Sequence, residues 1–169
     1  MRQFVTPVAL VAAFLALAAG CGGSKSSSSS GGGAATVKLG GSKLGKILID
    51  DKGRTLYLFE ADKARKSTCS GACAATWPPL TAASPSGASG LDSGALATTK
   101  RTDGTQQVTY HGHPLYNYAG DGTTVGSTKG EALNTFGGTW YVVDAGGKAV
   151  QPGSASDMGS SGGGGGNGY

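Results

Sequence analysis

Short apolar runs end two neighbouring segments, Lys46–Ile49 and Arg54–Phe59, and such short runs bounded by turn residues are typical of β-strands. The residues between the segments are Asp-Asp-Lys-Gly, so the pattern predicts a hairpin with Gly53 at a left-handed turn position. Side chains alternate between the two faces of a strand, which places Leu56 and Leu58 together on one face. The opposite face then carries Thr55, Tyr57 and Phe59.

Further strand patterns occur at Leu96–Arg101, Gln106–Tyr110, Pro114–Tyr118 and Thr139–Val143. Turn residues at Thr102–Thr105 predict a second hairpin, His111-Gly112 predicts a turn, and Asp144–Gly147 predicts another. We expect Thr81–Gly90 to be a loop that joins the two halves of the domain. Because 32 glycines interrupt the chain and no helical period follows the N-terminus, the predicted fold class is mainly β, a small antiparallel domain.

One segment recurs. Gly53–Asp62 aligns without a gap on Gly112–Asp121, and each copy leads on to a tryptophan, Trp77 or Trp140. The recurrence predicts two related β-hairpin repeats, at about residues 44–80 and 106–143. We interpret the shared Tyr-x-aromatic-x-x-Asp motif as structural, because its aromatic rings can fill a small core and its carboxylates can accept turn N–H bonds. The motif residues are Tyr57, Phe59, Asp62, Tyr116, Tyr118 and Asp121.

The N-terminus has the pattern of an export signal. A cationic start and an apolar run from Val8 to Ala19 end in small residues before Cys21. The pattern resembles a bacterial lipobox, so residues 1–20 are predicted to be a signal peptide and Cys21 to carry the lipid. Residues 21–35 are rich in Ser and Gly and predict a flexible tether. The predicted β-domain then spans residues 36–151, and the Gly-rich residues 152–169 predict a disordered tail.

The predicted export signal and lipidation site indicate the compartment and partners of the protein. We expect the chain to be exported and held by Cys21 at the outer face of the cell membrane, or at the outer membrane of a double-membrane envelope. Lys63, Arg65 and Lys66 form the densest cationic cluster, and Glu60 lies close to it. The net charge of +4 is otherwise spread along the chain, which indicates a solvated loop rather than a nucleic-acid surface.

Several uncommon strings resemble a known bacterial lipoprotein family. They are KGRTLYLFEAD, STCSGACAATWPPL, YHGHPLYNYAGD and FGGTWYVV, and the resemblance covers roughly Leu44–Val143. The family is described as the secreted repeat of unknown function, or as predicted lipoproteins with a Tyr-x-aromatic-x-x-Asp motif. The resemblance implies an exported, membrane-anchored protein, and it supplies no catalytic residues.

Two cysteines remain once Cys21 is assigned to lipid. Cys69 and Cys73 lie four residues apart, within reach of a disulfide, and an exported protein is in an oxidising compartment. We predict a structural disulfide, with a redox-active pair as the alternative. His111 and His113 are the other chemical candidates, either as exposed turn residues or as metal ligands. A four-ligand site would need both histidines and both cysteines together.

Trp77-Pro-Pro-Leu80 is interpreted as a buried plug, with a surface aromatic for glycans or peptides as the alternative. The sequence thus predicts a non-enzymatic binding or structural module of the envelope, with no identified cofactor and with an unspecified protein or glycan partner. The alternative function is a redox or copper-handling lipoprotein that uses Cys69 and Cys73, with or without His111 and His113.

Overall fold

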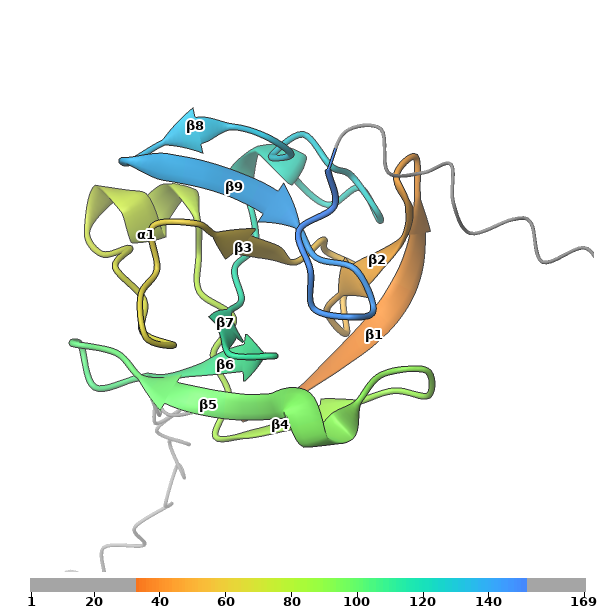
Figure 1. Ribbon diagram of the computed structural model, residues 1–169, viewed down its shortest axis with the longest axis horizontal. Helices are drawn as coiled ribbons and strands as arrows, with labels where there is room; N and C mark the ends of the chain where they lie inside the picture. Colours follow the sequence, from red (N-terminus) through yellow and green to blue (C-terminus); the bar gives the residue numbers. More distant parts are fainter. Residues whose placement is uncertain (1–32, 152–169) are drawn as a thin grey trace, which may run out of the picture.

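The structure is a computed structural model that describes residues 33–151. The predicted signal peptide at 1–20, the lipidation site Cys21, most of the predicted tether and the predicted tail at 152–169 lie outside the described residues. Within them the chain is mainly β, as predicted, with three small three-stranded sheets (Figure 1). No helix in this part has the length and apolar content needed to cross a membrane.

Ten strands and helices, with two short 3-10 helices at Ser93–Ala95 and Ala119–Asp121, make up the domain. The elements are β1 (Ala34–Ser42), β2 (Gly45–Ile49), β3 (Tyr57–Phe59), α1 (Ala72–Thr76), β4 (Ser84–Gly87), β5 (Leu96–Lys100), β6 (Gln106–Tyr110), β7 (His113–Pro114), β8 (Asn134–Thr135) and β9 (Gly138–Val142).

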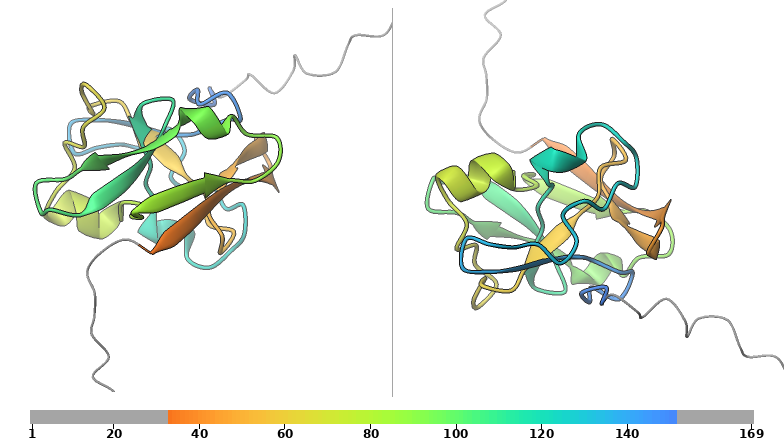
Figure 2. Two further views of the ribbon diagram at one scale, coloured as in Figure 1. Left: turned by 90° about the horizontal axis from the view of Figure 1, so that it is seen from below. Right: turned by 90° about the horizontal axis from the view of Figure 1, so that it is seen from above.

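The sheets have the strand orders β2-β1-β4, β3-β9-β8 and β5-β6-β7, and every pairing is antiparallel except that of β1 with β4. Figure 2 shows β4 and β5 crossing the face seen from below, and β8 and β9 crossing the face seen from above. The long strand β1 runs along one side of the domain, between these two faces (Figure 1).

Two segments differ from the sequence prediction. Strand β1 begins at Ala34, inside the predicted tether, because Ala35 and Val37 are buried in the core. The predicted loop Thr81–Gly90 contains β4, which pairs with β1 in parallel although its sequence is Ser-Pro-Ser-Gly. Backbone groups of an exposed strand edge pair regardless of side chain, so β4 has no pattern from which it could be predicted.

The first predicted hairpin forms only near its turn. Gly53 has a φ of 80°, and the Asp50 N–H donates to the carbonyl of Arg54 at 2.9 Å. Beyond Thr55 the strand turns away from β2, and β3 pairs with β9 instead. The predicted division of faces is confirmed, since Leu56 and Leu58 pack in a different cluster from Tyr57 and Phe59.

The second hairpin has the predicted strands, β5 and β6, with Lys100 opposite Gln106 at the turn. His111 and Gly112 follow β6 with φ values of 47° and 85°, as a tight left-handed turn requires. This turn leads into β7 and then into the second copy of the motif.

The two repeats are related by a closed cycle of backbone hydrogen bonds in each. In the first, Leu56 donates to Leu48, Leu48 to Val143, and Val143 to Leu56, at 3.0, 2.8 and 3.2 Å. The second cycle has the same order at 3.0, 2.8 and 2.9 Å, and consists of Leu115, Val108 and Leu80. Each hairpin is therefore completed by a segment from the other repeat, Val143 for the first and Leu80 for the second.

The aliphatic members of these cycles lie in one buried cluster, and the aromatic motif residues form another. In the second cluster the rings of Phe59, Trp140, Trp77 and Tyr118 follow one another with centroids 4.0, 4.0 and 4.3 Å apart. Such aromatic pairs each contribute about 0.5–1.5 kcal/mol beyond the area they bury. Phe59 of the first repeat thus packs on the tryptophan of the second, and Tyr118 of the second on the tryptophan of the first.

Candidate functional site

The first tyrosine of each motif copy donates its phenol proton to the motif carboxylate of the other repeat. The hydroxyl of Tyr57 lies 2.7 Å from Oδ2 of Asp121, and that of Tyr116 lies 2.8 Å from Oδ2 of Asp62. The second carboxylate oxygens hold loops, because Asp62 Oδ1 accepts from the N–H of Thr68 and Asp121 Oδ1 accepts from Lys129 and Ser127. The sequence indicated the turn-fixing carboxylates but not their phenol partners.

Burial changes the acidity of these groups. Burial raises the pKa of Tyr57 and of Tyr116 well above the ordinary value for a phenol, and the neighbouring carboxylate is the second-largest cause of the increase. Burial also raises the pKa of Asp62, although hydrogen bonds from Thr68 and Tyr116 favour its charged form. Both phenols therefore stay protonated and act as hydrogen-bond donors, and each Tyr–Asp pair is satisfied within the protein.

Cys69 and Cys73 form a disulfide with their Cα atoms 5.3 Å apart. Both are buried, and Cys73 lies in α1, the single short turn of helix that leads to Trp77. Trp77 is fully buried, so the alternative interpretation of it as a surface aromatic is wrong. The bridge and the indole together fix the segment that completes the second repeat.

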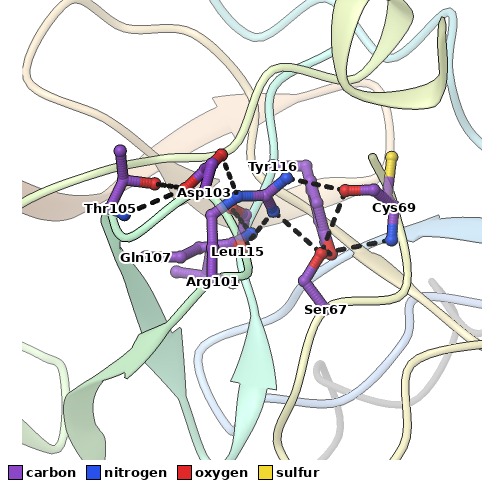
Figure 3. Close-up of polar contacts among 8 residues, drawn as sticks. All are labelled: Ser67, Cys69, Arg101, Asp103, Thr105, Gln107, Leu115 and Tyr116. Carbon is purple, nitrogen blue, oxygen red and sulfur yellow. Dashed lines mark hydrogen bonds and ion pairs between the residues drawn. The ribbon is translucent and has the colours of Figure 1, made fainter. Parts of the chain in front are cut away.

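Arg101 has a role that the sequence did not predict. It follows β5 directly, yet its side chain is only 4% exposed. Its guanidinium donates to Ser67 Oγ at 2.8 Å, Gln107 Oε1 at 2.7 Å and the Cys69 carbonyl at 2.7 Å (Figure 3). Asp103 lies 3.3 Å from Nε. A buried guanidinium requires such a set of acceptors, and here they come from both repeats.

The network continues to the motif. Ser67 Oγ lies 2.7 Å from the hydroxyl of Tyr116 (Figure 3). The same hydroxyl donates to Asp62. Gln107 is buried as well, and its amide donates to the Leu115 carbonyl at 2.9 Å. No sequence signal marks this network, because its acceptors are a backbone carbonyl, a hydroxyl and an amide that occur in many exposed loops.

A polar hollow of about 200 Å³ opens beside this network. Its lining joins the loop that contains the disulfide to the β5–β6 turn: Ser67, Thr68, Cys69, Ser70, Arg101 and Thr102. The lining contains four hydroxyl groups and one guanidinium, and it contains no carboxylate and no imidazole. These groups suit recognition of a polar or anionic group.

The histidines lie elsewhere. Both are exposed, and His111 lines a second hollow of about 320 Å³ together with Arg65 and Asp92. Cys69 and Cys73 are bonded to each other, and within residues 33–151 no three His, Cys, Asp or Glu side chains are grouped to hold a metal ion. The four candidate copper ligands are therefore not brought together.

Fold and site define a class of protein, a disulfide-bonded β-domain of two repeats that complete one another. The family model described as a secreted repeat of unknown function matches residues 38–81 and 97–144, which together exceed half of the chain. The chain belongs to this family. Each matched segment contains one of the predicted repeats and extends beyond it at both ends. Neither the curated proteins nor the solved structures include a significant match to the chain.

Proposed function

We propose that the protein is a non-enzymatic binding module of the cell envelope, tethered by lipid at Cys21, that recognises an oxyanion at the hollow beside Arg101. Export is supported by the family, whose repeats are secreted. The lipid anchor is supported by the small-residue run that ends at Cys21.

One observation carries the binding role. The motif phenols and carboxylates satisfy each other in the interior, whereas the hollow is lined by Arg101 and by the hydroxyls of Ser70 and Thr102, which make no hydrogen bond within the described residues. Arg101 has five N–H groups, of which four donate within the described residues. The remaining one is a donor for a carboxylate or phosphate oxygen. Because the lining holds no general base, the geometry favours binding over catalysis.

The surroundings of the hollow fit an anionic ligand. Lys63 and Lys66 lie on the exposed loop that leads into Ser67, and exposed Lys100 precedes Arg101. Envelope polymers carry phosphate or carboxylate groups, and either would meet the same donors.

Titration of the purified protein with inorganic phosphate, and separately with glucuronate, tests the site by NMR. Amide resonances of Thr68–Ser70 and Thr102 should move with one of these anions. Ser70→Ala combined with Thr102→Val removes two lining hydroxyls and should weaken the response, whereas Thr123→Val, on an exposed loop outside the lining, should not. An unmoved spectrum with both anions would refute the binding site.

The anchor is tested separately. Cys21→Ser should abolish incorporation of labelled palmitate and move the protein out of the detergent phase, while Ser24→Ala in the tether should leave both unchanged. A Cys21→Ser protein that still carries lipid would exclude this anchor and leave the binding result unaffected.

A further inference from the structure

We propose that the aromatic core is a relay for one-electron oxidation, in which the stacked tryptophans pass an electron hole to two tyrosines that each release a proton to the neighbouring carboxylate. The relay goes beyond the binding role and uses none of the residues that line the hollow.

The rings are close enough to act as one pathway. Trp77 and Trp140 are stacked with centroids 4.0 Å apart and planes inclined by 2°. Tyr57 contacts Trp77 edge-on at 5.3 Å, and Tyr116 contacts Trp140 edge-on at 5.1 Å. Electron transfer rates fall steeply with distance, so rings in van der Waals contact exchange a hole faster than they exchange it with any separated group.

The hole has an entry point. Tyr118 is half-buried, and its ring lies 4.3 Å from Trp77. Phe59 closes the other end of the stack and is buried. A one-electron oxidant at the surface near Tyr118 would thus be separated from the tryptophan pair by a single ring.

Hydrogen bonding then decides where the hole rests. A phenol is oxidised readily only when its proton has an acceptor, and a carboxylate at hydrogen-bond distance is such an acceptor. Tyr57 and Tyr116 each have one, at 2.7 and 2.8 Å. Burial raises the pKa of Asp62, which makes this carboxylate a stronger base for the proton of Tyr116.

The tryptophans lack an equivalent base. The indole N–H of Trp77 is buried and has no hydrogen-bond partner among the described residues, and that of Trp140 donates to the Thr135 carbonyl at 3.3 Å. A buried donor without a partner is uncommon and needs an explanation. Here it keeps an oxidised Trp77 from losing its proton, so its hole stays mobile and passes on to a neighbouring ring.

The step is balanced. The oxidant is an outer-sphere, high-potential metal complex of the ruthenium(III) type, which takes one electron from a tryptophan and leaves its radical cation. Tyr57 returns one electron to that tryptophan, and its phenol proton moves to Oδ2 of Asp121. The products are a reduced oxidant, a neutral tyrosyl radical and a neutral carboxylic acid. Tyr116 and Asp62 perform the same step from Trp140.

Flash oxidation of the full-length protein with photogenerated tris(bipyridine)ruthenium(III), followed by rapid freezing and electron paramagnetic resonance, tests the relay. The tyrosyl signal should fall about tenfold or more in the Tyr57→Phe/Tyr116→Phe double variant. It should be unchanged in Tyr110→Phe, because buried Tyr110 donates to the Ala145 carbonyl, which cannot take a proton. Equal signals in the native protein and the double variant would overturn the proposal.

The carboxylates give a second readout that does not depend on losing a ring. Asp62→Asn with Asp121→Asn should replace the tyrosyl signal by a tryptophan radical cation, identified by its optical absorption. In the native protein, radical formation should be slower in D2O. If the tyrosyl signal persists in the asparagine variant, or forms at the same rate in D2O, the carboxylates do not accept the proton and the relay is refuted.

Discussion

The hydroxyl of Tyr57 lies 2.7 Å from the carboxylate of Asp121, although 64 residues separate them in the chain. Tyr116 and Asp62 repeat the contact in the opposite direction. Between the two contacts, Tyr57 and Tyr116 exchange backbone hydrogen bonds of 2.8 and 3.0 Å. The motif that recurs in the sequence is therefore a device that joins one copy to the other.

Removing one phenol oxygen should show how much each Tyr–Asp contact between the repeats stabilises the fold. Tyr57→Phe and Tyr116→Phe keep the ring but leave a carboxylate oxygen without its donor, on buried Asp121 and on half-buried Asp62, so each should lower the free energy of unfolding by about 1–3 kcal/mol. Tyr141→Phe is the matched control, because Tyr141 is half-buried and its hydroxyl makes no hydrogen bond within residues 33–151. Urea unfolding measures all three, and losses no larger than that of the control would mean that the pairs do not hold the repeats.

The raised pKa of Asp62 predicts a pH dependence of stability. The folded state holds this proton more tightly than the unfolded state, so the contribution of Asp62 is fully present below its unfolded pKa, about 4, and is lost as the pH rises through its raised folded pKa. Asp62→Asn keeps an oxygen for Thr68 and cannot ionise. The stability of the native protein minus that of this variant should therefore decrease as the pH rises from about 4.

Glu131 provides an independent comparison. Burial raises its pKa too, while the N–H of Val142 donates to its Oε2 at 2.7 Å. Urea midpoints can be measured across the acid range for the native protein, Asp62→Asn and Glu131→Gln. Each variant should lose only part of the decrease in stability with rising pH, because each removes one of the two carboxyl groups. A stability difference between the native protein and Asp62→Asn that is constant with pH would contradict the assignment for Asp62.

The disulfide should be a modest stabiliser. It closes a very short loop, for which the chain-entropy relation gives about 2 kcal/mol. Replacing Cys69 and Cys73 together by Ala should lower the free energy of unfolding by about that amount and leave the β circular dichroism unchanged. The native protein without reductant should show no alkylatable thiol at these positions. Two readily labelled thiols would contradict the bridge.

The aromatic stack should tolerate no added volume. A Cβ atom on Gly130 would lie 2.8 Å from Trp77 and 3.0 Å from Tyr57, so Gly130→Ala should cost about 1–3 kcal/mol by overpacking. Gly41→Ala is the control, because a Cβ there meets nothing within 4 Å and the backbone is not left-handed. Thermal unfolding compares the two, and equal midpoints would show that the stack can move to accept a methyl group.

Much of this architecture follows from sequence because local rules agree with the fold. The ungapped alignment of Gly53–Asp62 on Gly112–Asp121 identified equivalent residues, and a period of two separated Leu56 from Tyr57. Gly53 was placed correctly in a left-handed turn because the backbone there requires a positive φ.

Other features could not follow from those rules. Each motif copy leads on to a tryptophan, Trp77 or Trp140, but the sequence does not say which hairpin the segment after each tryptophan completes. Arg101 was missed because a basic residue beside a Thr-Asp-Gly turn is normally solvated. Its burial depends on acceptors from the loop of the other repeat, Ser67 and the Cys69 carbonyl, and such a contact exists only after the repeats have come together.

The exchange of the Val143 and Leu80 segments has a consequence for how such a chain can be shortened. A polypeptide with a single copy of the repeat would lack the partner for its own cycle of hydrogen bonds and would have to obtain it from a second molecule. Its folding would then depend on protein concentration, as in an obligate dimer. Joining the copies in one chain replaces that dependence by a fixed effective concentration, so the domain stays assembled however few molecules surround it.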